Sequence, residues 1–582
     1  MDIKENYSKG DSYKLFLKIY KECTKVTQNK LSILALETLF AGFIEITLLI
    51  STSFVLFNIS GEGNELPSNL SYILSKIGID FFGNLQITLL FVFLAIFSGI
   101  YNFYLFRKTI NTSNRASNDI TSNLIKSFLD MPYTKYLNIS TDKLLTAATY
   151  SSSLMKNILS YLEIMRVSIT SIFIIIGALI ATDAKGFILL IILLIIYYQI
   201  TLKTKKIYLS LSNKIVQENL SFNENINTVY GGFRDIKFSN TVEYFKNNLI
   251  EINQREKIMQ AKIYLYKLFP RLLLEIIIYS ILGLTILYIT IFNIEISLAN
   301  ILIYVFIGLR LLPQIQKLYV LYASVQTTFF QTNNIFDFLK YCRTDDNHFS
   351  YTQTRLIKIE DPKISNKNIK IRINKMSFSY PKSNKFIFKN FSFKIYESEW
   401  VAVQGATGSG KSTFLDLLLG LINPIKGEIE IYIDKNSSNK ISENIAHVGQ
   451  FPYIFQGDVQ TNIVTPNYFP YKVDEELLNK AIFVSCLDED LNNNKLSLSK
   501  NVGERGNKLS GGQKQRLGIA RAIYSIKNKK ILILDEATSS LDEETALKVL
   551  KRLKSKFCYL TIVYVTHRKD TLKYFDRNII LK

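Results

Sequence analysis

Residues 405–412 read GATGSGKS and lie between an apolar run at 401–403 and a helix-like stretch that begins at Ser412. Glycines at 405, 408 and 410 let the backbone curl so that its N–H groups point at phosphate oxygens, with a helix N-terminus behind them. In such a loop Lys411 supplies a positive charge for the terminal phosphates, and the Ser412 hydroxyl is a ligand for Mg²⁺. The full eight-residue match favours a nucleotide site over an ordinary glycine-rich turn before a helix.

Two further segments follow in a fixed order. Residues 509–513 read LSGGQ, and residues 531–536 read ILILDE. The continuous apolar run at 531–534 predicts a central strand of a parallel sheet, buried on both faces, whose carboxyl end carries the functional residues. At that end Asp535 is predicted to hold Mg²⁺, and Glu536 to orient and polarise an attacking water as general base.

A phosphate loop followed by LSGGQ and then by an apolar strand ending in Asp-Glu resembles the ABC ATPase family. The resemblance implies an α/β P-loop ABC ATPase domain over residues 369–582, with ATP and Mg²⁺ as cofactors. Smaller matches carry further roles over from the family. They are Gln450 for coupling Mg²⁺ to the membrane domain, Tyr380 for stacking on adenine, Asp542 for an inter-subunit contact and His567 for the γ-phosphate switch.

Taken together, these matches imply three sets of site residues. The catalytic set is Glu536, His567, Lys411 and Gln450, and the Mg²⁺ ligands are Ser412, Gln450 and Asp535. The nucleotide-binding set is Tyr380, Gly405, Ala406, Thr407, Gly408, Ser409, Gly410, Lys411, Ser412, Thr413, Ser510, Gly511, Gly512, Gln513 and Asp542.

The motif VGERG at 502–506 resembles the cross-linking loop of ABC exporters, which importer ATPases usually lack. In the family, the LSGGQ signature of one subunit faces the phosphate loop of the other, so the resemblance implies a dimer. Every catalytic position matches the active pattern, which favours a homodimer with two working sites. A heterodimer with a degenerate partner remains an alternative.

The N-terminal half predicts a membrane domain. The chain has 582 residues, 48% of them hydrophobic, and a mean hydropathy of +0.12. Most of its long apolar segments reach the ~20 residues that span a bilayer, and ILLIILLII at 188–196 is too apolar for a soluble helix. The predicted fold class is therefore a six-helix all-α transmembrane domain followed by the ATPase domain. The predicted spans are residues 31–57, 85–106, 158–181, 186–202, 271–292 and 297–320.

The predicted domain order is a cytoplasmic N-terminus with an elbow helix at 1–30, the transmembrane domain at 31–320, a linker at 321–368 and the ATPase domain at 369–582. The alternating apolar and basic residues at 13–20 resemble the interfacial elbow helix of exporters. Exporters of this plan also place short transverse helices against their ATPase domains. Candidates here are residues 130–136, which contain Pro132, and residues 228–236, which contain a glycine pair.

Lysine and arginine are concentrated in the connections 106–157 and 203–268, whereas the other connections hold almost none. The positive-inside rule then places both chain ends in the cytoplasm, and the resemblance implies a bacterial cytoplasmic membrane. Much of the net charge of +21 follows from this bias, so no nucleic-acid partner is expected. We expect no cleavable signal peptide. Four scattered cysteines predict neither a disulfide framework nor a zinc site.

Three short fragments resemble their counterparts in bacterial lipid-linked oligosaccharide flippases: FIE at 43–45, FPRLLLE at 269–275 and LRLLP at 309–313. Residues 58–84, with a possible helix at 69–77, lie where such flippases carry an external helix. The resemblance favours a lipid-linked oligosaccharide as cargo and a membrane lipid or lipid-linked substrate as partner. A peptide, drug or lipid exporter is the alternative. An ABC protein that gates a channel or senses a ligand is a third interpretation.

Charges within membrane spans are costly and usually functional, so Arg271 and Arg310 are candidates for contact with an anionic cargo. Each also has a simpler interpretation. Arg271 and Glu275 lie four residues apart on a helix and would pair, and Arg310 would pair with Glu45.

Overall fold

The computed structural model describes most of the chain. The described residues are 11–59, 84–139, 141–181, 184–292, 298–343, 355–359, 368–380, 383, 385–433, 441–464 and 473–581. The chain divides into two compact units, which are treated separately here. The first comprises Met1–Met131 and Asn138–Thr344, and the second comprises Pro132–Leu137 and Asp345–Lys582.

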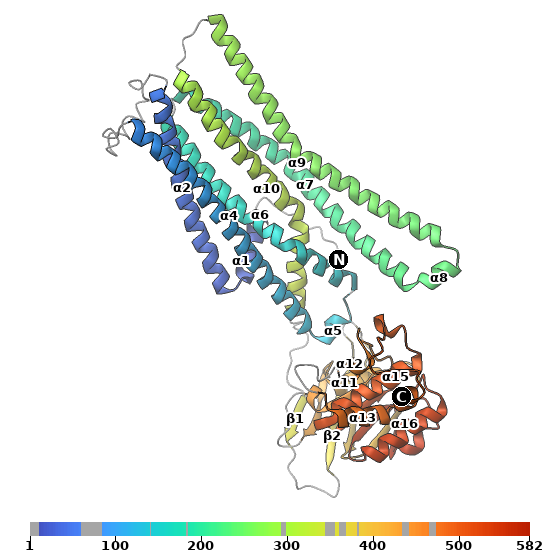
Figure 1. The fold of residues 1–582 in the computed structure, drawn as a ribbon. Coiled ribbons are helices and arrows are strands. Elements are labelled where there is room, and N and C mark those ends of the chain that lie inside the picture. Colours follow the sequence, from blue (N-terminus) through green and yellow to red (C-terminus); the bar gives the residue numbers. More distant parts are fainter. Residues whose placement is uncertain are drawn as a thin grey trace. The chain divides into compact units, whose positions relative to one another are not determined.

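The regular elements of the first unit are all helices in the part that the structure describes, and the apolar runs in the sequence fall within them (Figure 1). Its helices α2, α4 and α6 pack against one another, and α10 packs on α6 and α7. Helices α7 and α9 run side by side, with the short α8 at the turn between them. The bounds are α1 Asp11–Glu22, α2 Lys25–Ile59, α4 Asn84–Leu129, α6 Thr141–Ala181, α7 Ala184–Gly231, α8 Phe233–Phe238, α9 Val242–Phe292 and α10 Leu298–Arg343.

Within the described residues, three stretches are long and apolar enough to cross a membrane: Lys25–Leu56, Thr88–Leu129 and Leu154–Ile180. They contain or largely overlap the first three predicted spans. The other three predicted spans fall within α7, α9 and α10 almost entirely, and they stay predictions. The helix expected at 69–77 lies outside the described residues.

Helices begin or end at the positions predicted beside the spans, and their roles stay predictions. Helix α1 covers the stretch that resembles an elbow helix. Helix α7 ends at Gly231 and α8 begins two residues later, at the predicted glycine break. The first transverse candidate forms α5, Tyr133–Tyr136, with Pro132 before its first residue. By its contacts this short helix belongs to the second unit, where Tyr133 packs against the apolar core.

The second unit is built on two sheets (Figure 1). One has the strand order β1-β5-β2-β3, and the other has the order β6-β7-β8-β4-β9 with every pair parallel. The strands are β1 Arg355–Ile359, β2 Ile369–Phe378, β3 Phe388–Tyr396, β4 Trp400–Gly405, β5 Lys426–Ile433, β6 Ile445–Val448, β7 Ile531–Asp535, β8 Thr561–Val565 and β9 Arg577–Leu581. Its longer helices are α11 Lys411–Leu419, α13 Glu475–Val484, α15 Gly511–Tyr524 and α16 Glu543–Lys556, and shorter ones are α12 Val459–Val464 and α14 Leu487–Asn492.

The predicted central strand is β7, which lies between β6 and β8 and whose residues 531–534 are all buried. Two apolar clusters cover the faces of this parallel sheet, one containing Leu532 and Leu534 and the other Ile531 and Ile533. This alternation explains the unbroken apolar run, because a strand buried on both faces needs apolar side chains at every position.

The segment predicted as a linker, 321–368, contains part of a helix and a strand. Helix α10 continues to Arg343, so the first part of this segment is helical. Further on, β1 pairs in parallel with β5 and so forms part of a sheet of the second unit. Both features lie beyond the apolar periodicity that marks the spans, which explains why the sequence pattern did not indicate them.

Candidate functional site

The phosphate loop connects β4 to α11, as predicted. Gly408 and Gly410 have φ of +85° and +89°, which L side chains rarely adopt. A Cβ on Gly410 would also lie 2.5 Å from Cγ2 of Ile387, so glycine is required there for space as well. The loop is therefore held in a tight curl at the N-terminus of a helix.

Two side chains of the loop suit an anionic ligand. Nζ of Lys411 donates to the carbonyl oxygens of Gly405 and Ala406, at 2.9 Å each. Oγ of Ser409 is buried and has no hydrogen-bond partner among the described residues. A buried hydroxyl without a partner is costly, and phosphate oxygens would satisfy it. The loop thus fits the nucleotide that its sequence predicts.

Three of the predicted catalytic residues meet at the end of β7. Nε2 of Gln450 donates to Oε2 of Glu536 at 3.0 Å, and Nε2 of His567 lies 3.2 Å from Oε1 of the same carboxylate. Gln450 follows β6 and His567 follows β8, so the two strands beside β7 supply the two partners. The Glu536 side chain remains 20% exposed, and that of His567 50%. This arrangement leaves the carboxylate fixed in direction and reachable by water.

Glu536 itself has φ of +45°, a backbone conformation that costs a non-glycine residue about 1–3 kcal/mol. Its backbone N–H donates to the carbonyl of Val565 at 3.0 Å, and its carbonyl accepts from Ser539 N at 2.9 Å. These bonds hold the residue in the unfavourable conformation. Strain of this kind concentrates at functional sites, where the surrounding structure enforces it.

Negative charge accumulates beside the loop. Burial, and the neighbouring Glu536 carboxylate, raise the pKa of Asp535, while the Lys411 ammonium acts in the opposite direction. Burial, together with the charge of Asp535, raises the pKa of Asp416 on α11 to about 6. A divalent cation would relieve this repulsion, and the oxygen donors of Ser412, Gln450 and Asp535 are the kind that Mg²⁺ prefers.

The signature motif begins α15. Ser510 is the N-cap, its Oγ accepts from the backbone N–H of Gln513 at 3.2 Å, and Oε1 of Gln513 accepts from Ser510 N at 3.1 Å. Asp542 caps α16 in the same way, by accepting from Thr545 N at 2.9 Å. Among the described residues, no hydrogen bond or ion pair links the signature to the phosphate loop of the same chain.

Gln515 is a residue of the site that the sequence reasoning missed. It is buried in α15, where Nε2 donates to Oγ of Ser539 at 2.7 Å and lies 3.4 Å from the carbonyl oxygens of Gln450 and Glu536. Oε1 accepts from Ser540 N at 2.7 Å. The Gln515 amide thus links the signature helix to Gln450, to Glu536 and to the turn at Ser539 and Ser540. A signal was present, because Gln515 shares a helical stripe with buried residues 518, 519 and 522.

Tyr380 and Thr413, both in the predicted nucleotide set, contact each other. Their hydroxyl oxygens are 3.2 Å apart, and the Tyr380 ring packs edge-on against Phe378 with centroids 5.2 Å apart. Thr413 is buried, whereas Ser412 is exposed. The structure therefore separates the two hydroxyl residues that follow Lys411: one faces the protein interior and the other is available to a ligand.

Of the two candidates for cargo contact, the structure describes the side chain of Arg310 and leaves that of Arg271 undescribed. Nη1 of Arg310 pairs with Oε2 of Glu45 at 3.3 Å, which is the simpler interpretation given above. Ser98 and Asn102 also donate to Glu45, at 3.1 and 3.4 Å. Arg271 lies in α9, but its side chain is outside the described residues.

A second group of charges lies on α6 and α10. Arg166 donates to both carboxylate oxygens of the buried Glu163 at 3.0 Å each, and Nζ of Lys317 pairs with Oε2 of the same carboxylate at 2.6 Å. Nη1 of Arg166 also lies 3.3 Å from Oδ1 of Asn102, which joins this group to the one around Glu45. The carboxylates are buried, whereas the side chains of Arg310 and Lys317 are 35% and 41% exposed.

Residues 388–539 match the family model described as ABC transporter. This chain contains an ABC transporter domain. The matched segment includes the phosphate loop, Gln450, the signature and the Asp535-Glu536 pair, whereas Tyr380, Asp542 and His567 lie outside it.

Curated relatives include several ABC exporters. The chain is 34% identical over 210 residues to an ATP-dependent lipid A-core flippase of Cupriavidus metallidurans, and 38% identical over 224 residues to the multidrug resistance-like protein MdlB of Buchnera aphidicola. It is 35% identical over 224 residues to the lactococcin-G-processing and transport protein LagD of Lactococcus lactis. The alignments cover 36%, 37% and 38% of this chain and 35%, 37% and 30% of the relatives' own lengths.

The fold extends the comparison to nearly the whole chain. The structure of a bacterial Atm1-family ABC exporter with ATP bound matches with a TM-score of 0.71, over 96% of this chain and 94% of that one. At 17% identity this likeness shows the fold alone. The chain therefore joins a helical N-terminal region to a C-terminal α/β ATPase domain, in the architecture of a fused ABC exporter.

Proposed function

We propose that this chain is an ATP-driven exporter that works by alternating access as a homodimer in the bacterial cytoplasmic membrane, with both termini in the cytoplasm. The observation that carries the proposal is the Glu536 carboxylate held between Gln450 and His567 beside the phosphate loop. The exporter fold over 96% of the chain supports coupling of this site to membrane helices.

In the proposed reaction, Glu536 accepts the proton of a water that attacks the γ-phosphorus, while the bond from that phosphorus to the β–γ bridging oxygen breaks and ADP leaves. Gln450 and His567 keep the carboxylate aimed at that water. Lys411 exchanges its bonds to the loop carbonyls for bonds to phosphate oxygens. Ser510 and Gln513 of a second copy complete the site from the other side. When bound at Ser412, Gln450 and Asp535, Mg²⁺ would neutralise charge on the phosphate oxygens.

We further propose that the cargo is a lipid-linked oligosaccharide. A pyrophosphate linkage needs cationic groups within the membrane region, and Arg310 and Lys317 keep part of their surface exposed while their carboxylate partners are buried. The names of the relatives favour a second candidate, a peptide, drug or lipid exporter, since they include a lipid A-core flippase, a multidrug resistance-like protein and a lactococcin transporter.

The test is reconstitution in lipid vesicles of the wild type and of Glu536→Gln, with and without a polyprenyl-pyrophosphate oligosaccharide. We expect Glu536→Gln to keep ATP binding but to lower hydrolysis by about 100-fold or more, since it removes the general base. Protection of the lipid from reagents outside the vesicle measures translocation. Hydrolysis by Glu536→Gln at the wild-type rate would contradict the ATPase assignment. Strong ATPase activity without lipid protection would instead favour the second candidate.

A further inference from the structure

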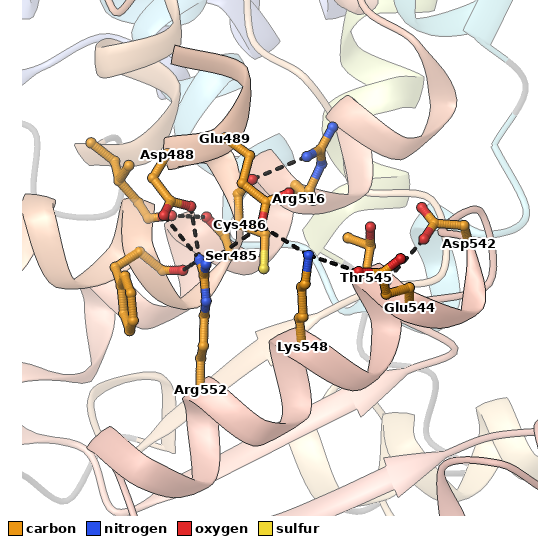
Figure 2. A network of polar contacts seen from close by, with 12 residues as sticks. Ser485, Cys486, Asp488, Glu489, Arg516, Asp542, Glu544, Thr545, Lys548 and Arg552 are labelled. Carbon is orange, nitrogen blue, oxygen red and sulfur yellow. Dashed lines mark hydrogen bonds and ion pairs between the residues drawn. The ribbon is translucent and has the colours of Figure 1, made fainter. Parts of the chain in front are cut away.

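A buried carboxylate, that of Asp490, contacts the last residue of the signature motif, Gln513. Asp490 is in α14, is only 7% exposed and accepts two hydrogen bonds on the same oxygen, Oδ2. Nη2 of Arg516 donates at 2.7 Å and Nε2 of Gln513 donates at 3.3 Å. Arg516 is fixed in turn by a second bond, from Nη1 to the carbonyl of Cys486 at 3.0 Å, which Figure 2 shows.

These contacts decide which way the Gln513 amide faces. An ionised carboxylate only accepts hydrogen bonds, so it selects the NH₂ end of the amide. Oε1 of Gln513 must then face the opposite direction, where it accepts from Ser510 N at 3.1 Å. If the amide were reversed, an NH₂ group would face the Ser510 N–H and the oxygen would face the carboxylate, and both contacts would be repulsive. Asp490 therefore favours the closed capping box at the start of α15.

The capping box in turn fixes the orientation of the Ser510 side chain. Oγ of Ser510 accepts from the Gln513 N–H at 3.2 Å, which leaves its own hydrogen available to an acceptor outside the chain. Under the proposed function, that acceptor is the γ-phosphate of ATP bound to a second copy. We propose that Asp490 is a positioning residue, which fixes the Gln513 amide and so presents the signature to the ATP held by the partner subunit. The inference rests on the homodimeric ATPase described above.

A purely structural ion pair between Asp490 and Arg516 is the competing explanation. The two explanations differ in which ATP site loses activity when Asp490 is replaced. A structural defect impairs the subunit that carries it, whereas a misplaced signature impairs the ATP site whose phosphate loop belongs to the other subunit. Mixed dimers can separate these outcomes, because each ATP site draws on two chains.

The experiment uses Asp490→Asn, which keeps the shape of the side chain but can offer an NH₂ group to Gln513. Differently tagged full-length chains are purified as mixed dimers in which Lys411→Ala disables one phosphate loop. In the first dimer both substitutions are in one chain, so the working loop faces the altered signature. In the second dimer they are in opposite chains, so the working loop faces an unaltered signature. The two dimers contain the same substitutions and differ only in arrangement.

We expect ATPase activity in the first dimer to fall about tenfold below that of the dimer carrying Lys411→Ala alone, as for the loss of one charge-assisted bond. The second dimer should stay within about twofold of that reference. Equal losses in both arrangements, or no loss in either, would overturn the proposal. If Lys411→Ala abolishes ATPase activity at both sites, homodimers are compared instead. Adding Asp490→Asn to Gln513→Ala should then cause no further loss of ATPase activity. Additive losses would overturn the proposal.

Asp488→Asn is the matched control. Asp488 is on the same helix and also pairs with an arginine, Arg552 of α16, at 2.8 Å (Figure 2). Within the described parts of the chain, no hydrogen bond or ion pair links Asp488 to the signature. Glu489 also pairs with Arg552, so the arginine retains a partner in this variant. We expect Asp488→Asn to leave both mixed dimers unchanged. An inactive wild-type homodimer would contradict the proposed function and this proposal with it, whereas an active one with equal losses contradicts Asp490 alone.

Discussion

At the scale of single residues, the site depends on carboxylates whose charges are set by their surroundings. Glu536 is held by two partners and remains accessible, whereas Asp416 and Asp535 are partly buried and repel each other. The first arrangement serves the proposed chemistry. The second carries a cost to folding, because unfolding would return both carboxyls to water and separate them.

The cost at Asp416 predicts a dependence of stability on pH. Its pKa is about 6 in the folded chain, above the ordinary value of 3.8, so between these values the folded state binds more protons than the unfolded state. The contribution of Asp416 to stability should therefore fall as pH rises through this window and be lowest above it. In thermal unfolding without Mg²⁺, we expect Asp416→Asn to raise the unfolding midpoint at pH 7.5 and to match the wild type at low pH, where both are neutral.

The pH comparison is its own control, because the same two proteins are measured at both values. A gap between variant and wild type that persists unchanged at pH 4 would mean that the introduced asparagine acts by packing rather than by removing a charge. The absence of any gap between variant and wild type at pH 7.5 would contradict the raised pKa of Asp416.

Much of the geometry of the candidate site could be predicted at this scale, because local chemistry determines which residues its loop and strand end need. The loop needs a positive φ at residues 408 and 410, which explains its glycines there. Asp535 and Glu536 could be predicted because they end an apolar run that forms a buried strand. The burial of Gln515 agrees with a helical stripe in the sequence, but its contacts, and those of Asp490, could not be found by spacing. Their partners lie far away in sequence, and only the folded chain brings them together.

At the scale of elements, α5 is the feature with the clearest consequence. Tyr133 packs on the core cluster that also contains the buried Phe414 of α11 and the partly buried Tyr380. Its ring stacks on Tyr136, with centroids 6.0 Å apart. The helix thereby contacts the unit that holds the phosphate loop, while its flanking residues belong to the helical unit.

This packing predicts that Tyr133→Ala uncouples the two activities. If the chain translocates a cargo as proposed, removing this partly buried ring should lower translocation by about tenfold while ATPase activity continues. Both rates are measured in the same vesicles. Tyr136→Ala, on the same helix but with a side chain 52% exposed, is the control and should affect translocation less. Equal losses of ATPase and translocation in Tyr133→Ala would contradict a coupling role.

At the scale of the whole molecule, helical periodicity and apolar length predict long helices well, but they say little about where each helix ends. The helix that contains the third predicted span begins at Thr141, and the one with the sixth ends at Arg343, far outside the apolar windows. Polar extensions of this kind are stabilised by packing on neighbouring helices, which a hydropathy window does not measure.

The membrane topology is the prediction that belongs to this scale. We expect single cysteines replacing Lys76 and Glu295 to react with a membrane-impermeant thiol reagent added outside intact cells. A cysteine replacing Lys237, in α8, should react only after the membrane is opened, because the basic connections are expected in the cytoplasm. The background carries Cys558→Ser, since Cys23, Cys342 and Cys486 are buried. Labelling of the Lys237 position in intact cells would reverse the orientation.

The assignment of Pro132–Leu137 to the second unit also bears on how the protein can be dissected. A recombinant fragment that starts at Asp345 would contain every ATP-site motif but would lack this short segment, which the intact chain supplies from far upstream. Its surface around the core cluster would lose the cover that Tyr133 provides, which exposes apolar side chains and favours self-association. Fusing residues 132–137 to such a fragment, or adding them as a peptide, would restore a soluble ATPase fragment for biochemical work.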